Sequence, residues 1–276
     1  MSLLAHETWA GNGPPLLLLH GFTGNRSTFA HLRERLTPHA SVVAVDLPGH
    51  GQSPISAETT FASTLAALLA LLEALGLAWV DVAGYSLGAR VALGLAVESG
   101  PRVRRLVLES GSPGLRRRRD RGERRRQDEA LATRIESDGM DAFVEHWEAL
   151  PLFSGVRALS AEVQQALRGR RLAGDAEGLA WSLRRLGLGS QPSYWSALPN
   201  VRTPTLLLSG ARDEKFTEVA GRMAAELPVV WGHVFPGVGH APHLEAPDAW
   251  ALEVSGFLST PWIERPLVES DSGSNG

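Results

Sequence analysis

The stretch Gly84-Tyr85-Ser86-Leu87-Gly88 decides the fold, because it matches the pattern Gly-x-Ser-x-Gly between two segments of opposite character. The apolar run 80–83 before it predicts a buried strand, and residues 87–97 after it have the length and composition of a helix. A serine on a sharp strand-to-helix turn exposes its hydroxyl above a sheet, and flanking glycines permit so tight a turn. The pattern alone is common, since any small-residue turn between strand and helix can match it, so the remaining sequence must support it.

Short apolar runs alternate with helix-length segments on both sides of this turn. Continuous hydrophobicity is typical of parallel strands that are covered on both faces. We expect strands at 16–19, 42–45, 80–83, 106–108, 205–208 and 233–235, and helices at 28–36, 63–75, 87–97 and 247–257. This alternation of strands and helices along the chain predicts an α/β fold with a doubly wound, mostly parallel sheet.

The alternation stops between about 115 and 198, where arginine-rich and amphipathic helical patterns replace the strands. We therefore expect a core formed by 1–114 and 199–265, with a helical cap at 115–198 inserted over one edge of the sheet. The polar segment 266–276 has the composition of a disordered tail. A chain of 276 residues is long enough to bury a sizeable core.

Two residues that follow later strands are expected to form a catalytic triad with Ser86. Asp213 comes directly after the strand at 205–208, and His240 directly after the last strand. A serine hydroxyl is a weak nucleophile or base until a histidine takes its proton, and an acid orients that histidine. The chain order Ser, Asp, His is the one that accompanies this kind of turn.

Each partner of Ser86 has a competitor close by in the sequence. His243 lies where a helix is expected to begin, and we interpret it as a structural histidine. Glu214 follows Asp213 directly, and the Gly-x-x-Asp spacing favours Asp213.

The negative charge that develops in such a reaction needs backbone N–H donors. We expect Leu87, at the start of the helix, and Phe22, in the loop 19–24, to supply them; the loop 46–51 after the next strand also fits. His20 and His50 in these loops are interpreted as braces. No two histidines flank a carboxylate at helical spacing, so we expect no metal site.

Composition excludes several classes of protein. A net charge of −3 gives no basic field for nucleic acid. The absence of cysteine excludes disulfides, thiolate catalysis and cysteine-ligated metal, and it fits a reducing compartment.

The first residues lack the pattern of a signal peptide, so a cytoplasmic location is expected. The segment 61–79 approaches the length of a membrane span, but its alanines and its continuation into a strand favour a helix packed on the sheet. Nothing in the sequence demands an obligate protein partner.

Taken together, four motifs resemble the α/β-hydrolase superfamily over nearly the whole chain: Leu19-His20-Gly21-Phe22, Asp46-Leu47-Pro48-Gly49-His50-Gly51, the turn at Ser86, and Gly239-His240. A narrower resemblance is to the 2-succinyl-6-hydroxy-2,4-cyclohexadiene-1-carboxylate synthases, lyases of the menaquinone pathway. The segments that carry it are 84–90, 112–115, 123–128, His146-Trp147, 151–153, Leu167-Arg168 and 210–216. Ala89 departs from this family, which often has glycine there.

The narrower resemblance implies elimination rather than hydrolysis. Pyruvate would leave 2-succinyl-5-enolpyruvyl-6-hydroxy-3-cyclohexene-1-carboxylate, with Ser86 as the base and without any cofactor or metal. The family's substrate is a small polycarboxylate with three carboxylates, a type of group that arginine binds through forked hydrogen bonds. The residues expected to bind it are Tyr85, Arg90, Arg124, Trp147 and Arg168.

Purely structural roles remain open for these side chains as alternatives to substrate binding. The segment 116–126 holds eight arginines and two acids, and such a run is usually a solvated helix face. Trp147 could equally belong to the core of the cap, and Arg90 could be a surface residue.

Other functions remain open as well. A serine carboxylesterase or carbon–carbon bond hydrolase would use the same triad for acyl transfer. A hormone-receptor-like binding protein would keep the pocket and act through a partner. A haloalkane dehalogenase would need aspartate at position 86 and is excluded.

Overall fold

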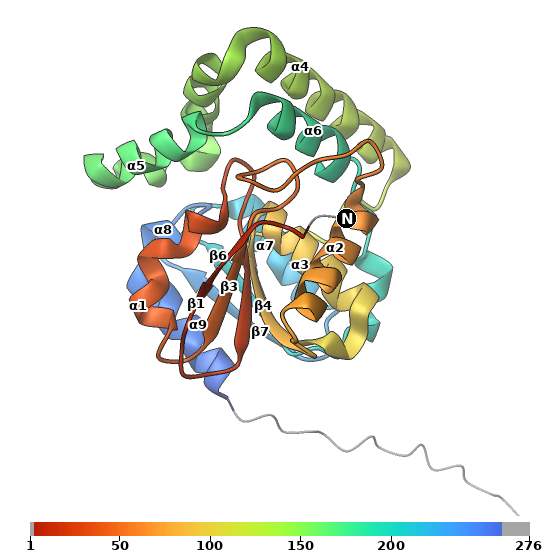
Figure 1. Ribbon diagram of the computed structural model, residues 1–276, viewed down its shortest axis with the longest axis vertical. Coiled ribbons are helices and arrows are strands. Elements are labelled where there is room, and N and C mark those ends of the chain that lie inside the picture. The colour runs from red at the N-terminus through yellow and green to blue at the C-terminus, as the bar shows by residue number, and fades with distance from the viewer. Residues whose placement is uncertain (1–2, 261–276) are drawn as a thin grey trace, which may run out of the picture.

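A seven-stranded sheet with the strand order β1-β3-β2-β4-β5-β6-β7 forms the centre of the computed structural model, which describes residues 3–260 (Figure 1). The strands are β1 (His6–Trp9), β2 (Pro15–Leu19), β3 (Ser41–Val45), β4 (Val80–Tyr85), β5 (Val103–Glu109), β6 (Thr205–Gly210) and β7 (Val230–Phe235). β1 runs antiparallel to β3, and all other neighbours are parallel. The tail expected at 266–276 lies outside the described residues.

Helices cover both faces of the sheet. One face carries α2 (Phe61–Ala74), α3 (Leu87–Ser99) and α7 (Glu214–Ala224), and η2 (Gly100–Arg102) leads from α3 into β5. The other face carries η1 (Arg26–Leu32), α1 (Arg33–Leu36), α8 (Pro242–Glu245) and α9 (Pro247–Ser259). Leu17 and Leu19 of β2 enter the first core, and Leu16 and Leu18 enter the second. A strand with two buried faces needs a continuous apolar run, which is why the runs in the sequence predicted these strands.

Three elements differ from expectation. β1 and α7 were not expected, because β1 has no apolar run, with Trp9 as its one apolar residue, and the apolar residues of α7 are interspersed with charged ones. The prediction that β7 is a buried strand is wrong. β7 is an edge strand with β6 as its neighbour, and it leaves Trp231 49% and Val234 47% exposed.

The segment between β5 and β6 is helical, and Figure 1 shows its long helices above the sheet. It contains α4 (Arg118–Ala149), η3 (Pro151–Phe153), η4 (Val156–Ala158), α5 (Ala161–Leu172), α6 (Ala176–Leu186) and η5 (Trp195–Asn200). α4 bends at Gly139, whose φ of 79° interrupts the helical backbone. α4 and α6 share a small core that includes Ile135, Phe143 and Leu183. The exact division of the chain at 115–198 stays a prediction.

The apolar segment 61–79 forms α2 and the turn that leads into β4. Within residues 3–260, no helix has both the length and the hydrophobicity that crossing a membrane requires.

Candidate active site

Ser86 lies on a strained turn between β4 and α3. Its φ of 51° and ψ of −104° fall in a region that residues other than glycine rarely occupy. The flanking glycines are required by close backbone contacts: a Cβ at Gly84 would lie 2.4 Å from the carbonyl carbon of Gly88, and one at Gly88 would lie 2.0 Å from the carbonyl oxygen of Leu19. The turn therefore holds the hydroxyl of Ser86 at the carboxyl edge of the parallel strands.

The structure brings Ser86, His240 and Asp213 together at this edge. His240 Nδ1 lies 2.6 Å from Asp213 Oδ2, and its Nε2 lies 3.2 Å from Ser86 Oγ. Asp213 follows β6 and His240 follows β7, so three separate strand ends supply the group. Because the carboxylate can only accept, we assign the proton to Nδ1, which leaves Nε2 free to accept from the Ser86 hydroxyl.

His243 and Glu214, the alternatives to His240 and Asp213, form no hydrogen bond with Ser86. His243 is fully buried, and both its backbone N–H and its Nδ1 contact Glu109 Oε1, at 3.1 and 2.7 Å. Trp250 Nε1 donates to the other oxygen of Glu109 at 2.9 Å. This network ties the end of β5 to α8 and α9, which agrees with a structural role for His243. Glu214 is exposed on the first turn of α7.

The N–H groups of Phe22 and Leu87 donate to no other residue within 3–260. Leu87 opens α3, where backbone N–H groups have no acceptor inside the helix. Both residues line the pocket that contains Ser86. This arrangement leaves both groups available to a ligand, and their role as oxyanion donors stays a proposal.

His20 braces the loop that contains Phe22. Its Nδ1 contacts the carbonyl of Gly21 at 2.7 Å, and its Nε2 accepts from the N–H of Leu47 at 3.0 Å. Burial lowers the pKa of His20 to about 4, so the ring is neutral at pH 7. The histidine therefore joins the two loops after β2 and β3, as the sequence interpretation holds.

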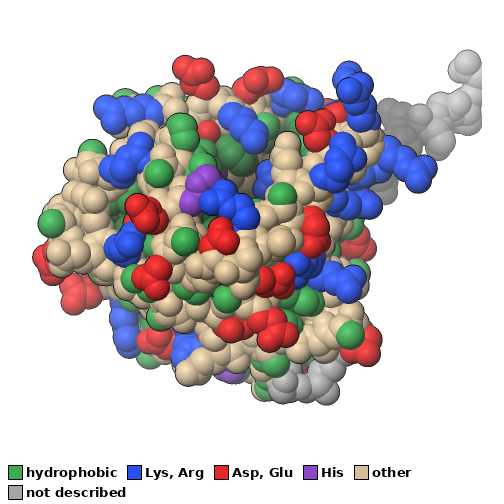
Figure 2. All heavy atoms as spheres, turned by 90° about the horizontal axis from the view of Figure 1, so that it is seen from above, with side chains coloured by type: hydrophobic (Ala, Val, Ile, Leu, Met, Phe, Trp, Pro, Cys, Tyr) green, Lys and Arg blue, Asp and Glu red, His purple; other side chains and the backbone are tan. Residues whose placement is uncertain are grey.

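The pocket above Ser86 and His240 is bordered by side chains of α4 and α6 and by the first turn of α7. The Lys and Arg side chains that line it are Arg90, Arg124 and Lys215, and no Asp or Glu side chain lines it. Figure 2 views the molecule from the cap side, where a hollow with hydrophobic side chains inside it has Lys and Arg side chains nearby. The charge of this pocket suits an anionic ligand.

Arg90 is held by neutral groups. Its Nη1 donates to the carbonyl of Leu186 at 2.8 Å and to Gln191 Oε1 at 2.9 Å, and no described carboxylate lies within ion-pair distance. Burial, together with the nearby positive charge of Arg124, lowers the pKa of Arg90 to about 9, so the guanidinium is still cationic at pH 7. A half-buried cation without a counter-ion loses part of its hydration, and a bound carboxylate would offset that loss.

The other predicted binding residues in the pocket have mixed surroundings. Arg124 pairs through Nε with Asp128 at 2.7 Å and keeps 36% of its side chain exposed. Trp147 packs against Phe22 and Phe153, and its Nε1 is buried without a described partner. Tyr85 lies beside His240, and burial raises its pKa well above the usual value.

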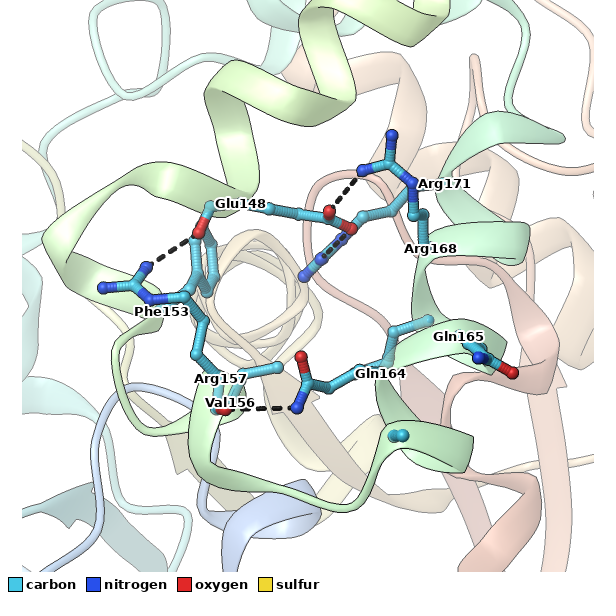
Figure 3. A pocket seen from close by; sticks show the side chains of 10 residues that line it. Glu148, Phe153, Val156, Arg157, Gln164, Gln165, Arg168 and Arg171 are labelled. Atoms are coloured by element: carbon cyan, nitrogen blue, oxygen red, sulfur yellow. Dashed lines mark hydrogen bonds and ion pairs between the residues drawn. The ribbon is translucent and has the colours of Figure 1, made fainter.

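The structure does not bring Arg168 into this pocket. Arg168 lines a second pocket between the end of α4 and α5, where it and Arg171 contact the two oxygens of Glu148 at 2.6 and 2.9 Å (Figure 3). The predicted contact between Arg168 and a substrate therefore has no support in this arrangement.

Two residues, one that contacts Arg90 and one that lines the pocket, were not predicted from the sequence. Gln191 is 1% exposed and holds Arg90, but a glutamine in a loop carries no recognisable signal. Lys215 is the only lysine in the chain, and the sequence pattern gave no reason to place it at the pocket. Among residues 3–260, no group of three or more His, Asp or Glu side chains is arranged to hold a metal ion.

Comparisons with known proteins agree with this geometry. The model of the family described as "Alpha/beta hydrolase family" matches residues 16–254. The chain is 37% identical to a Bacillus subtilis (strain 168) protein named "Putative 2-succinyl-6-hydroxy-2,4-cyclohexadiene-1-carboxylate synthase", over 89% of this chain and 90% of that protein. It is 35% identical to the synthase of the same compound from Salmonella paratyphi A, over 88% and 92%.

Solved structures of this fold also match along nearly the whole chain. The structure of MenH from S. aureus matches with a TM-score of 0.88 and 34% identity, over 92% of this chain and 97% of that one. A thermophilic esterase from Thermogutta terrifontis matches with a TM-score of 0.80 and 30% identity, over 92% of both chains. The chain therefore belongs to the alpha/beta hydrolase family, and along nearly its whole length it is similar to synthases of 2-succinyl-6-hydroxy-2,4-cyclohexadiene-1-carboxylate.

Proposed function

We propose that this protein is a 2-succinyl-6-hydroxy-2,4-cyclohexadiene-1-carboxylate synthase, a carbon–oxygen lyase of menaquinone biosynthesis. Its substrate would be 2-succinyl-5-enolpyruvyl-6-hydroxy-3-cyclohexene-1-carboxylate, from which it eliminates pyruvate. The observation that carries the proposal is the pocket itself, which Ser86 and His240 line together with three cationic side chains and no acidic one, with Asp213 behind His240. The names of the relatives support the same activity.

The triad acts in this reaction as a general base. His240 takes the proton of Ser86 Oγ, and Asp213 stabilises the imidazolium that forms. Oγ then removes the proton from the carbon next to the succinyl ketone, which requires the two atoms to approach within about 2.6–3.2 Å. The electron pair of that C–H bond moves onto the ketone oxygen, giving an enolate.

The enolate oxygen lies between the N–H groups of Phe22 and Leu87, which donate to it. When the ketone re-forms, a second ring double bond appears and the ring C–O bond breaks. Pyruvate leaves as its enolate and takes the proton that His240 holds. Every group in these steps belongs to this chain, and the serine is regenerated because it keeps the proton from carbon.

The cations bind the part of the substrate that does not react. Arg90 and Arg124 each bind a carboxylate through forked hydrogen bonds. Tyr85 and Trp147 place flat faces beside the ring. In this proposal the segment 115–198 acts as a cap that excludes water from the pocket, and the enzyme works in the cytoplasm.

Ester hydrolysis is the second candidate, because the same triad can form an acyl-enzyme and because the fold is also that of an esterase. A direct assay separates the two. Wild-type protein is given the menaquinone-pathway intermediate and, in parallel, a series of small neutral esters. Release of pyruvate at a rate far above that of ester cleavage supports the lyase. Ester cleavage without pyruvate release would contradict the lyase and leave the esterase.

A further inference from the structure

We propose that Lys215 is a specificity-determining residue that binds one carboxylate of the substrate, as the third cation of the pocket beside Arg90 and Arg124. This inference rests on the proposed function and deepens it. The three cations come from three different elements, α3, α4 and α7, and all line the pocket that contains Ser86. A ligand with three separate carboxylates can contact all three cations, whereas a monoanion can contact only part of the arrangement.

The place of Lys215 in α7 is unfavourable for the helix. Asp213 is the N-cap of α7, so Lys215 is the second residue inside the helix. The positive end of the helix dipole lies there, so a cation at that position destabilises the helix slightly rather than stabilising it. The acidic neighbour Glu214 suits this position, and Lys215 does not.

No ion pair offsets that cost. Within residues 3–260, Lys215 has no carboxylate within ion-pair distance, although 16 such pairs occur elsewhere in the structure. Its ammonium lies 5.3 Å from the centre of the Phe216 ring, a weak contact for an exposed group. A charge that breaks a local rule without compensation is expected at a functional site.

The identity of the residue gives a second, independent argument. Of the 27 Lys and Arg residues of the chain, 26 are arginine, so the composition of this chain strongly favours arginine. An ammonium is a compact, strongly hydrated point charge on a flexible stem, unlike the planar guanidinium. Such a group suits the exposed border of the pocket, where it can follow a carboxylate as the substrate enters.

The three cations also differ in how far they are already neutralised. Arg124 is paired with Asp128, whereas Arg90 and Lys215 contact no carboxylate among the described residues. Arg90 is half-buried and Lys215 is exposed. Lys215 should therefore contribute a moderate, salt-sensitive share of the affinity, and Arg90 a larger share that salt screens less.

The test compares Lys215→Gln, Lys215→Arg and the control Arg212→Gln. Arg212 is an exposed cation three residues earlier that does not line the pocket. Lys215→Gln should raise KM for the tricarboxylate substrate about three- to tenfold, where tenfold corresponds to ~1.4 kcal/mol, and should leave kcat within about twofold. Lys215→Arg should recover most of the affinity, and Arg212→Gln should match the wild type.

Two further measurements exclude a merely structural effect. Lys215→Gln should not lower the melting temperature, because it removes a cation from the positive end of a helix. The decrease of kcat/KM with added salt should be weaker in Lys215→Gln than in the wild type. An unchanged KM in Lys215→Gln, or an equal change in Arg212→Gln, would overturn the inference while the wild type still releases pyruvate. A wild-type enzyme that releases no pyruvate would instead contradict the proposed function and this inference with it.

Discussion

Gln191 Oε1 accepts a hydrogen bond from Arg90 Nη1 at 2.9 Å, while Gln191 Nε2 donates to the carbonyl of Ser112 at 3.2 Å. Gln191 lies in the segment that returns from α6 to the sheet, and Ser112 lies in the loop after β5. One buried amide therefore links both ends of the helical insertion to the guanidinium. Because its oxygen is neutral, it orients Arg90 without cancelling the charge that a substrate carboxylate needs.

Replacing Gln191 with Met should weaken substrate binding more than turnover. The variant keeps the volume of the side chain but loses a hydrogen bond to a charged group, which is commonly worth about 1.5–3 kcal/mol. KM for the tricarboxylate should rise about tenfold, with kcat changed far less. Steady-state kinetics, with circular dichroism as a check of folding, provide the measurement. A folded Gln191→Met protein with wild-type KM would show that Arg90 needs no such positioning.

Removing the hydroxyl of Ser86 should abolish turnover and leave binding. Ser86→Ala should reduce kcat by about 10³-fold or more, as loss of a nucleophile does in serine enzymes. The alanine side chain is smaller and faces the pocket, so the fold should persist. Asp213→Asn should also lose activity, because the imidazolium then lacks its counter-charge. Initial rates of pyruvate release and calorimetric titration with substrate provide the two readouts; near-full activity in both variants would contradict the triad.

The sequence predicted the parallel part of the sheet because strands buried on both faces need continuous apolar runs, as in β2 and β4. β1 could not be predicted in this way, since it pairs with β3 alone and only Trp9 of its residues is apolar. β7 was expected to be buried, but a strand at the edge of a sheet keeps only part of its surface covered. Whether a strand lies at an edge depends on the order of all the strands, which local patterns do not contain.

The residues of the candidate site also fall into those that the sequence could predict and those that it could not. Ser86, Asp213 and His240 could be predicted because each follows a recognisable strand, and parallel strands bring their carboxyl ends to one edge. Gln191 could not, because its role depends on where a loop packs against Arg90. Arg168 was expected in the pocket from the family resemblance, and its side chain pairs with Glu148 outside that pocket. Residues of the cap are therefore the least predictable part of the site.

His240→Ala and His243→Ala should have opposite effects. The first removes the base next to Ser86 and should abolish activity with little change in stability. The second removes one of the two side chains that contact the buried carboxylate of Glu109, which should lower the free energy of unfolding by about 2 kcal/mol or more. Its activity at a temperature where it is folded should remain within a few-fold of the wild type. Urea unfolding and pyruvate release, measured on both variants, check the pair. Loss of activity in a fully stable His243→Ala protein would show that the two histidines have been assigned the wrong way round.

The buried histidines should make the protein sensitive to mild acid. Burial lowers the pKa of His20 to about 4 and that of His50 to about 3, whereas both titrate near 6.5 in the unfolded chain. Below pH 6.5 the unfolded state binds protons that the folded state does not. The free energy of unfolding should therefore fall, by about 1.4 kcal/mol per pH unit for each histidine, as the pH falls from 6.5 towards 4.

The variant His50→Gln isolates one of these contributions. If the His50 ring braces its loop, His50→Gln has a lower free energy of unfolding than the wild type at pH 7. The difference in free energy of unfolding between the two proteins should shrink as the pH falls to 5, because only the wild type loses the contribution of neutral His50. Urea denaturation at a series of pH values measures the difference directly, so that carboxylates common to both proteins cancel. A difference that stays constant from pH 7 to pH 5 would mean that His50 is not held neutral by folding.

Arg90→Ala and Arg124→Ala should separate lyase from hydrolase activity. Each leaves one substrate carboxylate without its forked partner, and loss of a buried charge pair costs on the order of 2–5 kcal/mol. Turnover of the tricarboxylate should fall by roughly tenfold or more, since ~1.4 kcal/mol corresponds to tenfold. Cleavage of a small neutral ester, where it is measurable, should change little, because that substrate has no carboxylate.

Control variants distinguish a loss of substrate binding from a loss of folding in Arg90→Ala and Arg124→Ala. Arg118 begins the same arginine-rich helix, is exposed and has no ion-pair partner among the described residues, so Arg118→Ala should affect neither reaction. Arg124→Ala also leaves the buried carboxylate of Asp128 without its partner, so the double variant Arg124→Ala, Asp128→Asn should restore stability without restoring turnover. Equal losses on both substrates would mean that the two arginines serve the fold. A selective loss on the tricarboxylate, preserved in the double variant, is the result that substrate binding requires.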